Sequence, residues 1–266
     1  MYQTYYSLND TPFTKTIETK KLFKSSTFNE TIARLDYLVK TKGIGLITSE
    51  AGCGKTTALR AFKDSLNESL YKVIYFPFSS GTVKDFYRGI ALLLGEEPKF
   101  RKVDLFNQIQ SSISRLFYKN KITPVIILDE MQLAKNKFLN DLSLLFNFSM
   151  DSKNPYVLII AGLPHLTNRM RLNSNQSLNQ RITMRYEIDS LNKIEVNEYI
   201  NHHFELVNAP YKILSEDAIE AITTNSRGIP RLINNLVTHA LIRGATEKKE
   251  IINAETIYEI SKEVGI

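Results

Sequence analysis

The fold of this chain is decided by one stretch, Ser49-Glu50-Ala51-Gly52-Cys53-Gly54-Lys55-Thr56-Thr57. It follows a short apolar run at residues 44–48 and precedes a helical pattern that begins at residue 58. A strand, a turn with glycines, Gly-Lys-Thr and a helix are together the context of a phosphate-binding P-loop. Backbone N–H groups of the turn face a phosphate chain, and the lysine adds a positive charge. We therefore predict that all nine residues bind ATP.

One position departs from the usual pattern G-x-x-x-x-G-K-[ST]. Its first residue is Ser49 in place of glycine, although a turn can admit serine there. The Thr56 hydroxyl, which follows the lysine, is the group that binds Mg²⁺ in such loops. We therefore predict that Thr56 is one of the metal ligands.

The acidic pair Asp129-Glu130 ends a second apolar run, residues 124–128. A continuous apolar run of this kind is typical of a strand that is buried on both faces of a parallel sheet. After a P-loop, such a pair predicts a Walker B element, in which Asp129 holds Mg²⁺ and Glu130 orients and deprotonates the attacking water. The alternative is an ordinary strand end that happens to be acidic.

Strand and helix patterns alternate through most of the chain. Apolar, β-rich runs at residues 44–48, 71–76, 124–130, 156–162 and 182–188 are separated by helical patterns at 58–62, 83–94, 103–118 and 137–150. Alternation of this kind predicts an α/β fold, a parallel sheet flanked by helices. Beyond residue 190 only helices are expected, at 194–207, 215–224, 230–244 and 254–264.

These patterns predict three parts of the chain. Residues 1–26 show no helical period, and we expect an extended N-terminal arm anchored by its aromatic residues on a neighbouring surface. Residues 27–190 form the α/β nucleotide-binding domain, whose first helix we expect to begin near Phe28 with Asn29 as its cap. Residues 191–266 form a small C-terminal helical domain.

Composition sets limits on the class of protein. The chain has 266 residues, of which 43% are hydrophobic and 23% charged, as in ordinary globular proteins. No apolar run approaches the ~20 residues that a membrane span requires, and no secretion signal opens the chain. The single cysteine, Cys53, excludes an internal disulfide framework and suits a reducing compartment. We expect a cytoplasmic protein without a membrane partner.

The charge balance is moderately basic. The chain carries 34 Lys and Arg against 28 Asp and Glu, a formal net charge of +6. This excess permits a polyanionic partner such as nucleic acid without proving one. Basic residues in loops of the predicted nucleotide domain are the candidate contacts to DNA phosphates, with an exposed charged loop as the alternative; they are Lys99, Arg101, Lys102, Lys135 and Lys137.

Two arginines are candidates for the charge that phosphoryl transfer requires. Arg231 begins a predicted helix of the small domain and could sense bound nucleotide. Arg181 precedes the last predicted strand and could act on the nucleotide of an adjacent subunit, with Arg185 as its competitor. The alternative for each is an ordinary surface arginine. The pair His202-His203 lies in a predicted helix without acidic or cysteine neighbours, and we predict no metal other than Mg²⁺.

Taken together, these pieces resemble the AAA+ ATPases of the ExeA/TnsC-like group, which includes ATPase subunits of bacterial transposons. The resemblance covers nearly the whole chain, and its segments are Tyr6-Ser7-Leu8 with Pro12-Phe13, Leu22-Phe23-Lys24-Ser25, Glu30 with Ala33-Arg34-Leu35, Gly52 to Thr57, Leu128-Asp129-Glu130 with Gln132, Asn179-Gln180-Arg181-Ile182, and Gly228-Ile229-Pro230-Arg231-Leu232-Ile233-Asn234. It implies an AAA+ core with a helical lid, with ATP and Mg²⁺ as cofactors. It also implies a homo-oligomer, either a hexameric ring or a helical filament.

The resemblance also assigns roles to single residues. It places Arg181 near the arginine-finger region of the family and Arg231 on its sensor 2. One position differs: relatives carry a polar sensor 1 residue, often Gln or Asn, after the glycine that corresponds to Gly162, and here Leu163 follows. The polar residue is either absent or displaced to His165 or Asn168.

Three functions are compatible with this pattern. The first is an ATP-dependent regulator of DNA transposition that oligomerises on double-stranded DNA without sequence preference and recruits a transposase, with hydrolysis controlling disassembly; a target-selection protein is a further expected partner. The second is an ExeA-type secretion-assembly ATPase. We rank it second because such relatives are expected to carry a membrane span and a cell-wall-binding region, and this chain ends after its lid. The third is an ATP-binding switch with little hydrolysis.

Overall fold

The structure is a computed structural model of the chain and describes residues 2–14, 16–78 and 81–265. The chain divides into two compact units. The α/β unit comprises Glu30–Glu50 and Lys55–Ile188, and the helical unit comprises Met1–Asn29, Ala51–Gly54 and Asp189–Ile266. Each unit has a hydrophobic core of its own.

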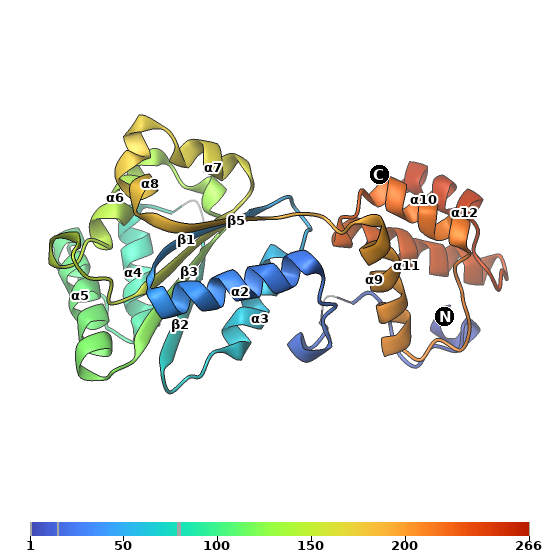
Figure 1. The fold of residues 1–266 in the computed structure, drawn as a ribbon, viewed down its shortest axis with the longest axis horizontal. Coiled ribbons are helices and arrows are strands. Elements are labelled where there is room, and N and C mark those ends of the chain that lie inside the picture. The colour runs from blue at the N-terminus through green and yellow to red at the C-terminus, as the bar shows by residue number, and fades with distance from the viewer. Residues whose placement is uncertain (1, 15, 79–80, 266) are drawn as a thin grey trace. The chain divides into compact units, whose positions relative to one another are not determined.

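The α/β unit is built on a five-stranded parallel sheet, which confirms the predicted fold class (Figure 1). Its strands, in the spatial order β2-β3-β4-β1-β5, are β1 Gly43–Ser49, β2 Tyr71–Pro77, β3 Thr123–Asp129, β4 Val157–Gly162 and β5 Ile182–Ile188. Every residue of β1, β3 and β4 is buried, as their uninterrupted apolar sequences require. The sheet brings the ends of β1, β3 and β4 to one edge, where ligands of such sheets bind.

Helices connect the strands. They are α2 Ser26–Thr41, α3 Lys55–Ser65, α4 Val83–Leu94, α5 Lys102–Ser114, α6 Asn136–Leu145, α7 His165–Met170 and α8 Gln176–Arg181. Short turns of helix lie at η2 Arg115–Lys119, η3 Met131–Leu133, η4 Ser149–Asp151 and η5 Asn173–Asn175. Figure 1 shows α2 across the near face of the sheet, where Leu38 lies against Gly45 of β1.

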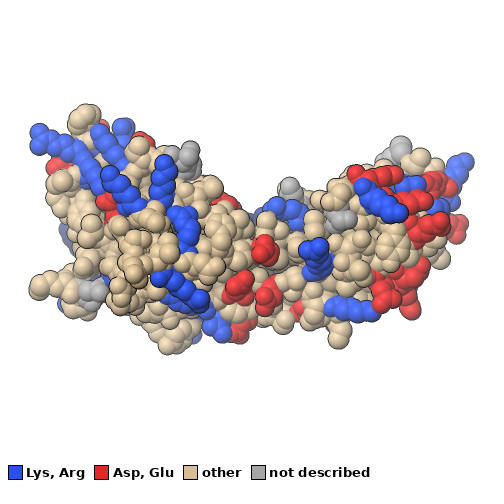
Figure 2. Space-filling view, turned by 90° about the horizontal axis from the view of Figure 1, so that it is seen from above, with Lys and Arg blue, Asp and Glu red and all other residues tan. Residues whose placement is uncertain are grey.

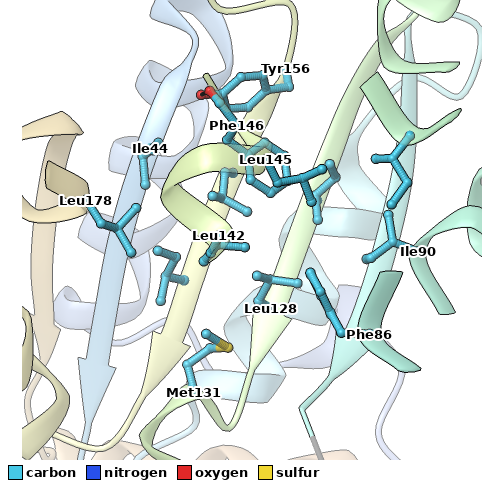
Figure 3. Packing of buried hydrophobic residues seen from close by; sticks show 14 of the residues in the cluster. Ile44, Phe86, Ile90, Leu128, Met131, Leu142, Leu145, Phe146, Tyr156 and Leu178 are labelled. Carbon is cyan, nitrogen blue, oxygen red and sulfur yellow. Dashed lines mark hydrogen bonds between the residues drawn. The ribbon is translucent and has the colours of Figure 1, made fainter. Parts of the chain in front are cut away.

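The core of the α/β unit lies on the other face of the sheet. Alternate strand residues such as Ile44 and Leu128 point into it and meet the apolar sides of α4, α5 and α6. Figure 3 shows Phe86 and Ile90 of α4 opposite Leu142 and Leu145 of α6, with Leu128 between them. Met131, which follows the acidic pair directly, is fully buried in this core and anchors the end of β3.

Three helix boundaries differ from the sequence-based expectation. α2 begins at Ser26 because the Ser25 hydroxyl, and not Asn29, accepts the Phe28 N–H, at 3.1 Å. α5 ends at Ser114 and continues as a wider π-type turn, η2. α6 ends at Leu145, where the Gln110 amide donates to the carbonyl oxygen of Leu145 at 3.1 Å and so satisfies a group that a longer helix would use.

Beyond residue 190 the helical unit is formed by α9 Lys193–Leu206, α10 Glu216–Ser226, α11 Pro230–Thr246 and α12 Ala254–Val264. The N-terminal segment belongs to it and is not an extended arm, since Tyr2–Tyr5 form a short helix, α1, and Thr19–Lys21 a 3-10 turn, η1. The physical reason is burial: Tyr6 is fully buried and its hydroxyl donates to the Lys249 carbonyl oxygen at 2.9 Å. Among the helices of the described residues, none combines the length and apolarity that crossing a membrane requires.

Candidate nucleotide-binding site

The P-loop connects β1 to α3, as its sequence predicts. Gly52 and Gly54 have φ of +99° and +92°, conformations in which a residue with a side chain would be strained. A Cβ added at Gly54 would meet no heavy atom within 4 Å, so this glycine borders open space. Ser49 is different: it lies within β1, where no glycine is needed, and its hydroxyl donates to the Glu50 carbonyl oxygen at 3.1 Å. The strand conformation explains why serine replaces glycine there.

Lys55, Thr56 and Asp129 meet at the edge of the sheet. The Lys55 ammonium forms an ion pair with one carboxylate oxygen of Asp129, and the Thr56 hydroxyl donates to the other at 2.9 Å. Lys55 and Asp129 are both buried, at 8% and 1% exposed. Burial alone would raise the pKa of Asp129, but Lys55, the Glu130 N–H and the Thr56 hydroxyl outweigh it and hold that pKa below its usual range. Asp129 is therefore an ionised, buried carboxylate.

Tyr75 of β2 is a contact of Asp129 that sequence reasoning missed. Its hydroxyl donates to the Asp129 carboxylate at 3.2 Å. Burial, followed by the negative charge of Asp129, raises the pKa of Tyr75 to about 12. Tyr75 thus remains a neutral donor that helps to fix the orientation of this carboxylate. No sequence signal pointed to it beyond its place near the end of a strand.

Glu130 occupies an unusual backbone conformation. Its φ and ψ are 60° and 29°, the left-handed region that costs a non-glycine residue of order 1 kcal/mol. Its N–H donates to the Asp129 carboxylate at 2.9 Å, and one carboxylate oxygen lies 3.8 Å from the Lys55 ammonium. The left-handed turn separates Glu130 from its buried neighbours, so its half-exposed carboxylate lies beside Lys55 while Met131 enters the core.

The polar side chain that contacts the end of β4 comes from another part of the chain. His165 and Asn168 are both exposed on α7. The side chain that reaches the end of β4 is Gln132, whose Oε1 accepts the Leu163 N–H at 3.2 Å and whose Nε2 donates to Glu130 Oε2 at 2.6 Å. Gln132 is part of the resemblance noted above, beside Leu128-Asp129-Glu130, but no role followed for it from the sequence.

The donor set at this edge fits Mg²⁺ and a phosphate chain. Hydroxyl and carboxylate oxygens are the hard ligands that Mg²⁺ prefers, and it usually takes one or two of them together with phosphates and water. Thr56 and Asp129 would hold the ion, and Lys55 would hold the phosphates. When bound, Mg²⁺ neutralises charge on the phosphate oxygens. The described residues contain no group of three or more His, Cys, Asp or Glu side chains that could hold a metal, so an ion here would depend on the Thr56 hydroxyl, phosphates and water besides Asp129.

Within the helical unit, residues 51–54 lie against the start of α11. The Arg231 N–H donates to the Gly52 carbonyl oxygen at 3.3 Å. A Cβ added at Gly52 would come within 2.8 Å of the Arg231 Cβ, so the close approach as well as the positive φ requires glycine here. Pro230 occupies the first turn of α11, a preferred position for proline, and Arg231 is exposed next to it.

The guanidinium of Arg181 forms hydrogen bonds within the α/β unit. It donates to the carbonyl oxygens of Ser143, at 2.8 Å, and Phe146, at 2.5 Å, and so helps to end α6. Its competitor Arg185 is exposed and donates to the backbone and side-chain oxygens of Asn179, both at 2.8 Å. A role for Arg181 on a neighbouring nucleotide therefore requires an exchange of these bonds and stays a prediction.

The five basic residues predicted to contact DNA are all exposed. Lys99, Arg101 and Lys102 lie at and before the start of α5, and Lys135 and Lys137 lie at the start of α6. Lys102 already forms an ion pair with Asp141, at 2.5 Å. The other four are the more available positive charges of the two groups.

Comparison with known proteins identifies the family and the fold. The model of a family described as "AAA domain" matches residues 38–170, half of the chain. The general secretion pathway protein A of Aeromonas hydrophila is 29% identical over 268 residues, which cover 98% of this chain and 49% of that protein. The chain thus spans about half the length of this curated relative.

Solved structures share the fold at lower identity. Cdc6p from Pyrobaculum aerophilum superposes with a TM-score of 0.72 at 15% identity, covering 95% of this chain and 70% of that one. The Aeropyrum pernix ORC1 protein in complex with DNA gives a TM-score of 0.63 at 14% identity, covering 99% and 69%. The parallel sheet, the P-loop between β1 and α3 and the family match lead to one conclusion: the chain belongs to the AAA family of P-loop ATPases.

Proposed function

We propose that this chain binds ATP with Mg²⁺ and hydrolyses it. The observation that carries the proposal is the convergence of Lys55, Thr56 and Asp129 at the carboxyl ends of β1 and β3. Lys55 binds the β- and γ-phosphates, while Thr56 and Asp129 hold the ion. Glu130, whose carboxylate lies beside Lys55, orients the attacking water and accepts its proton.

The variant Glu130→Gln tests this assignment. It keeps the shape of the side chain but removes the base, so we expect turnover to fall by about 10²- to 10⁴-fold while ATP affinity is retained. Steady-state phosphate release and nucleotide titration measure the two quantities. Lys55→Ala is the matched comparison and should lose binding itself. If Glu130→Gln keeps wild-type turnover, another residue activates the water. If the wild-type protein itself binds ATP but does not hydrolyse it, the protein is an ATP-binding switch and not an ATPase.

The second part of the proposal is that nucleotide controls assembly on duplex DNA. The positive charge is concentrated on the α/β unit, where 22 Lys and Arg face 14 Asp and Glu, whereas the helical unit has 12 against 14. The net charges are therefore +8 and −2, which give the +6 of the whole chain. On the face drawn in Figure 2, lysine and arginine side chains are frequent over the α/β unit and acidic ones over the helical unit. This asymmetry suits phosphate contacts by the α/β unit.

On this basis we propose a regulator of DNA transposition. It would oligomerise on target DNA without sequence preference, recruit a transposase, with a target-selection protein as a further partner, and disassemble on hydrolysis. The structurally similar ORC1 protein from Aeropyrum pernix was solved in complex with DNA. We also propose a cytoplasmic location, because a single cysteine suits a reducing compartment.

The same proposal includes the parts of the chain and the two arginines. Residues 27–190 would act as the nucleotide domain and residues 191–266 as its lid, with residues 1–26 attached to the lid. Arg231 would sense bound nucleotide from the lid. Arg181 would act as a finger on the nucleotide of an adjacent subunit in a ring or filament.

A second candidate is an ATPase of secretion assembly. The observation in its favour is the 29% identity to general secretion pathway protein A across 98% of this chain. Electron microscopy of the protein with duplex DNA, with ATP or a non-hydrolysable analogue, separates the two functions. Nucleotide-dependent polymers around DNA support the transposition proposal. Absence of DNA association under every nucleotide condition contradicts it and favours the secretion candidate.

A further inference from the structure

The side-chain amide of Gln132 joins the candidate base to the end of a neighbouring strand. Its Nε2 donates to Glu130 Oε2 at 2.6 Å, and its Oε1 accepts the Leu163 N–H, just beyond β4, at 3.2 Å. Gln132 is half-buried in the η3 turn, so this arrangement is not that of a solvated surface amide. One short side chain thus spans from β3 to β4.

The orientation of this amide is fixed by its two neighbours. A carboxylate only accepts hydrogen bonds, and a backbone N–H only donates them. Turning the amide over would place its oxygen against Glu130 and its NH₂ group against Leu163, so both hydrogen bonds would be lost. The bridge has one chemically sensible form.

Neighbouring residues fix the backbone of the turn that contains Gln132 and leave room for its side chain. Arg169 of α7 donates to the Gln132 carbonyl oxygen at 2.7 Å and to the Ala134 carbonyl oxygen, which fixes the backbone of the turn. The turn itself closes when the Leu133 N–H donates to the Glu130 carbonyl oxygen at 3.0 Å. Gly162 leaves the necessary room, since a Cβ there would lie 2.9 Å from Gln132 Oε1.

We propose that Gln132 is the positioning residue of Glu130, an inference that rests on the proposed ATPase activity. Its amide engages one carboxylate oxygen, Oε2, and leaves Oε1, the oxygen nearer Lys55, for the water. Because its other end is bound at Leu163, the direction of the Glu130 carboxylate depends on the position of the end of β4. Gln132 acts through Glu130 and does not itself touch the reacting atoms.

This bridge also accounts for the residue that follows Gly162. A polar side chain at position 163 is not needed to link the ends of β3 and β4. The Gln132 side chain, just beyond β3, already makes this link by accepting the backbone N–H of Leu163. The side chain at 163 is then free to be apolar. The side chain that makes the contact thus comes from the turn after β3 and not from the residue after β4.

Substitution of Gln132 tests the proposal. Gln132→Ala should lower kcat for ATP by about 10- to 100-fold, because a misdirected base costs this much, with nucleotide affinity unchanged. Gln132→Glu is isosteric but places a second carboxylate against Glu130, and should lower kcat at least as far. Gln110→Ala removes another half-buried amide, which donates to the backbone carbonyl oxygens of Leu145 and Asn147, and should keep wild-type kcat.

A double variant separates positioning from a general structural role. If Gln132 acts only through Glu130, then adding Gln132→Ala to Glu130→Gln should leave the residual turnover unchanged. A further fall in the double variant, or wild-type kcat in Gln132→Ala, overturns the proposal while the ATPase function stands. If the wild-type protein binds ATP without turnover, the ATPase proposal fails, and a crystal structure with a non-hydrolysable analogue decides on Gln132. An amide within hydrogen-bond distance of the Glu130 carboxylate supports the bridge, and separation of the two contradicts it.

Discussion

At the scale of single residues, the site depends on how one buried carboxylate is surrounded. Asp129 has four hydrogen-bond donors: Lys55, Thr56, Tyr75 and the Glu130 N–H. Leaving a buried charge short of partners is expensive, which explains why these donors come from separate parts of the chain. A donor removed from this set should alter how firmly the carboxylate is held more than whether it is charged.

Tyr75→Phe tests the donor that the sequence did not indicate. The ring stays in place and only the hydroxyl is lost, so we expect an unfolding free energy lower by about 1 to 2 kcal/mol, the usual effect of a lost hydrogen bond to a charged group. We also expect weaker Mg²⁺-dependent nucleotide binding, because Asp129 is less firmly oriented. Urea unfolding and nucleotide titration at several Mg²⁺ concentrations measure the two effects. Tyr71→Phe, on the same strand, is the control. If both variants show the same stability and the same Mg²⁺-dependent binding, the Tyr75 hydroxyl has no special role in holding Asp129.

At the scale of helices and strands, sequence patterns predicted most of the fold but few of its long-range contacts. The continuous apolar runs of β3 and β4 and the helical pattern of residues 83–94 are local signals, and the corresponding elements appear where they were expected. The end of α6 was misplaced because it depends on Gln110, 35 residues away.

The candidate site shows the same division. Glycines, Lys55, Thr56, Asp129 and Glu130 follow from a motif, so their meeting could be predicted from spacing. The link from Gln132 to Leu163 spans 31 residues and depends on the order of the strands. Spacing along the sequence contains no information about such a contact.

The start of α9 offers a test at this scale. The Asn192 side chain accepts the N–H groups of Ile194 and Glu195, both at 3.0 Å, and the Glu195 carboxylate accepts the Asn192 N–H at 3.1 Å. Asn192→Ala removes this capping box and should lower the stability of the helical unit by about 1 kcal/mol. Chemical unfolding followed by circular dichroism measures the loss. Asn197→Ala, on the exposed surface of the same helix, should cause no such decrease.

The buried histidine of α9 predicts a pH dependence. His203 is 3% exposed and stacks on Phe13 at 4.7 Å, and burial, with a further effect of His202, lowers the pKa of His203 to about 4. The unfolded chain, with a histidine pKa of about 6.5, binds the proton more readily. The stabilisation that comes from keeping His203 neutral should therefore be fully present above about pH 6.5. As the pH falls towards 4, the free energy of unfolding should decrease by up to about 3 kcal/mol on account of this group.

The histidine contribution can be isolated with two variants. His203→Phe keeps an aromatic ring against Phe13 and should remove this part of the pH dependence, while His202→Gln should retain it. Urea unfolding of the helical unit between pH 4.5 and 7.5 gives the comparison. If His203→Phe keeps the wild-type pH profile, then protonation of His203 does not govern the acid limit.

At the scale of the whole molecule, the division of charge between the two units predicts how the protein responds to salt. Replacing Lys99, Arg101 and Lys102 together by Ala should reduce the slope of log K for DNA against log salt by about two, since each free cation contributes roughly one. Lys102 should add little because it is paired with Asp141. Fluorescence anisotropy with labelled duplex DNA between low and moderate salt measures the slope.

The matched control removes the same charge from the helical unit. Lys212, Lys248 and Lys262 are exposed, and their triple alanine variant should leave the slope unchanged if DNA contacts the α/β unit. Equal changes in the two triple variants would indicate a dependence on net charge alone. An unchanged slope in the first variant would exclude the start of α5 as a DNA contact.

The bond between Tyr6 and Lys249 has a consequence for how the protein is made. It joins residues 243 positions apart, so the helical unit is interrupted in sequence by nearly the whole α/β unit. On the ribosome, residues 30–188 are complete before α11 exists, and domains of this size fold as units during synthesis. The N-terminal segment must wait, with Tyr6, Leu8 and Phe13 uncovered, until the last quarter of the chain emerges. Its aromatic residues are thus the earliest surface that a chaperone or a second nascent chain could meet.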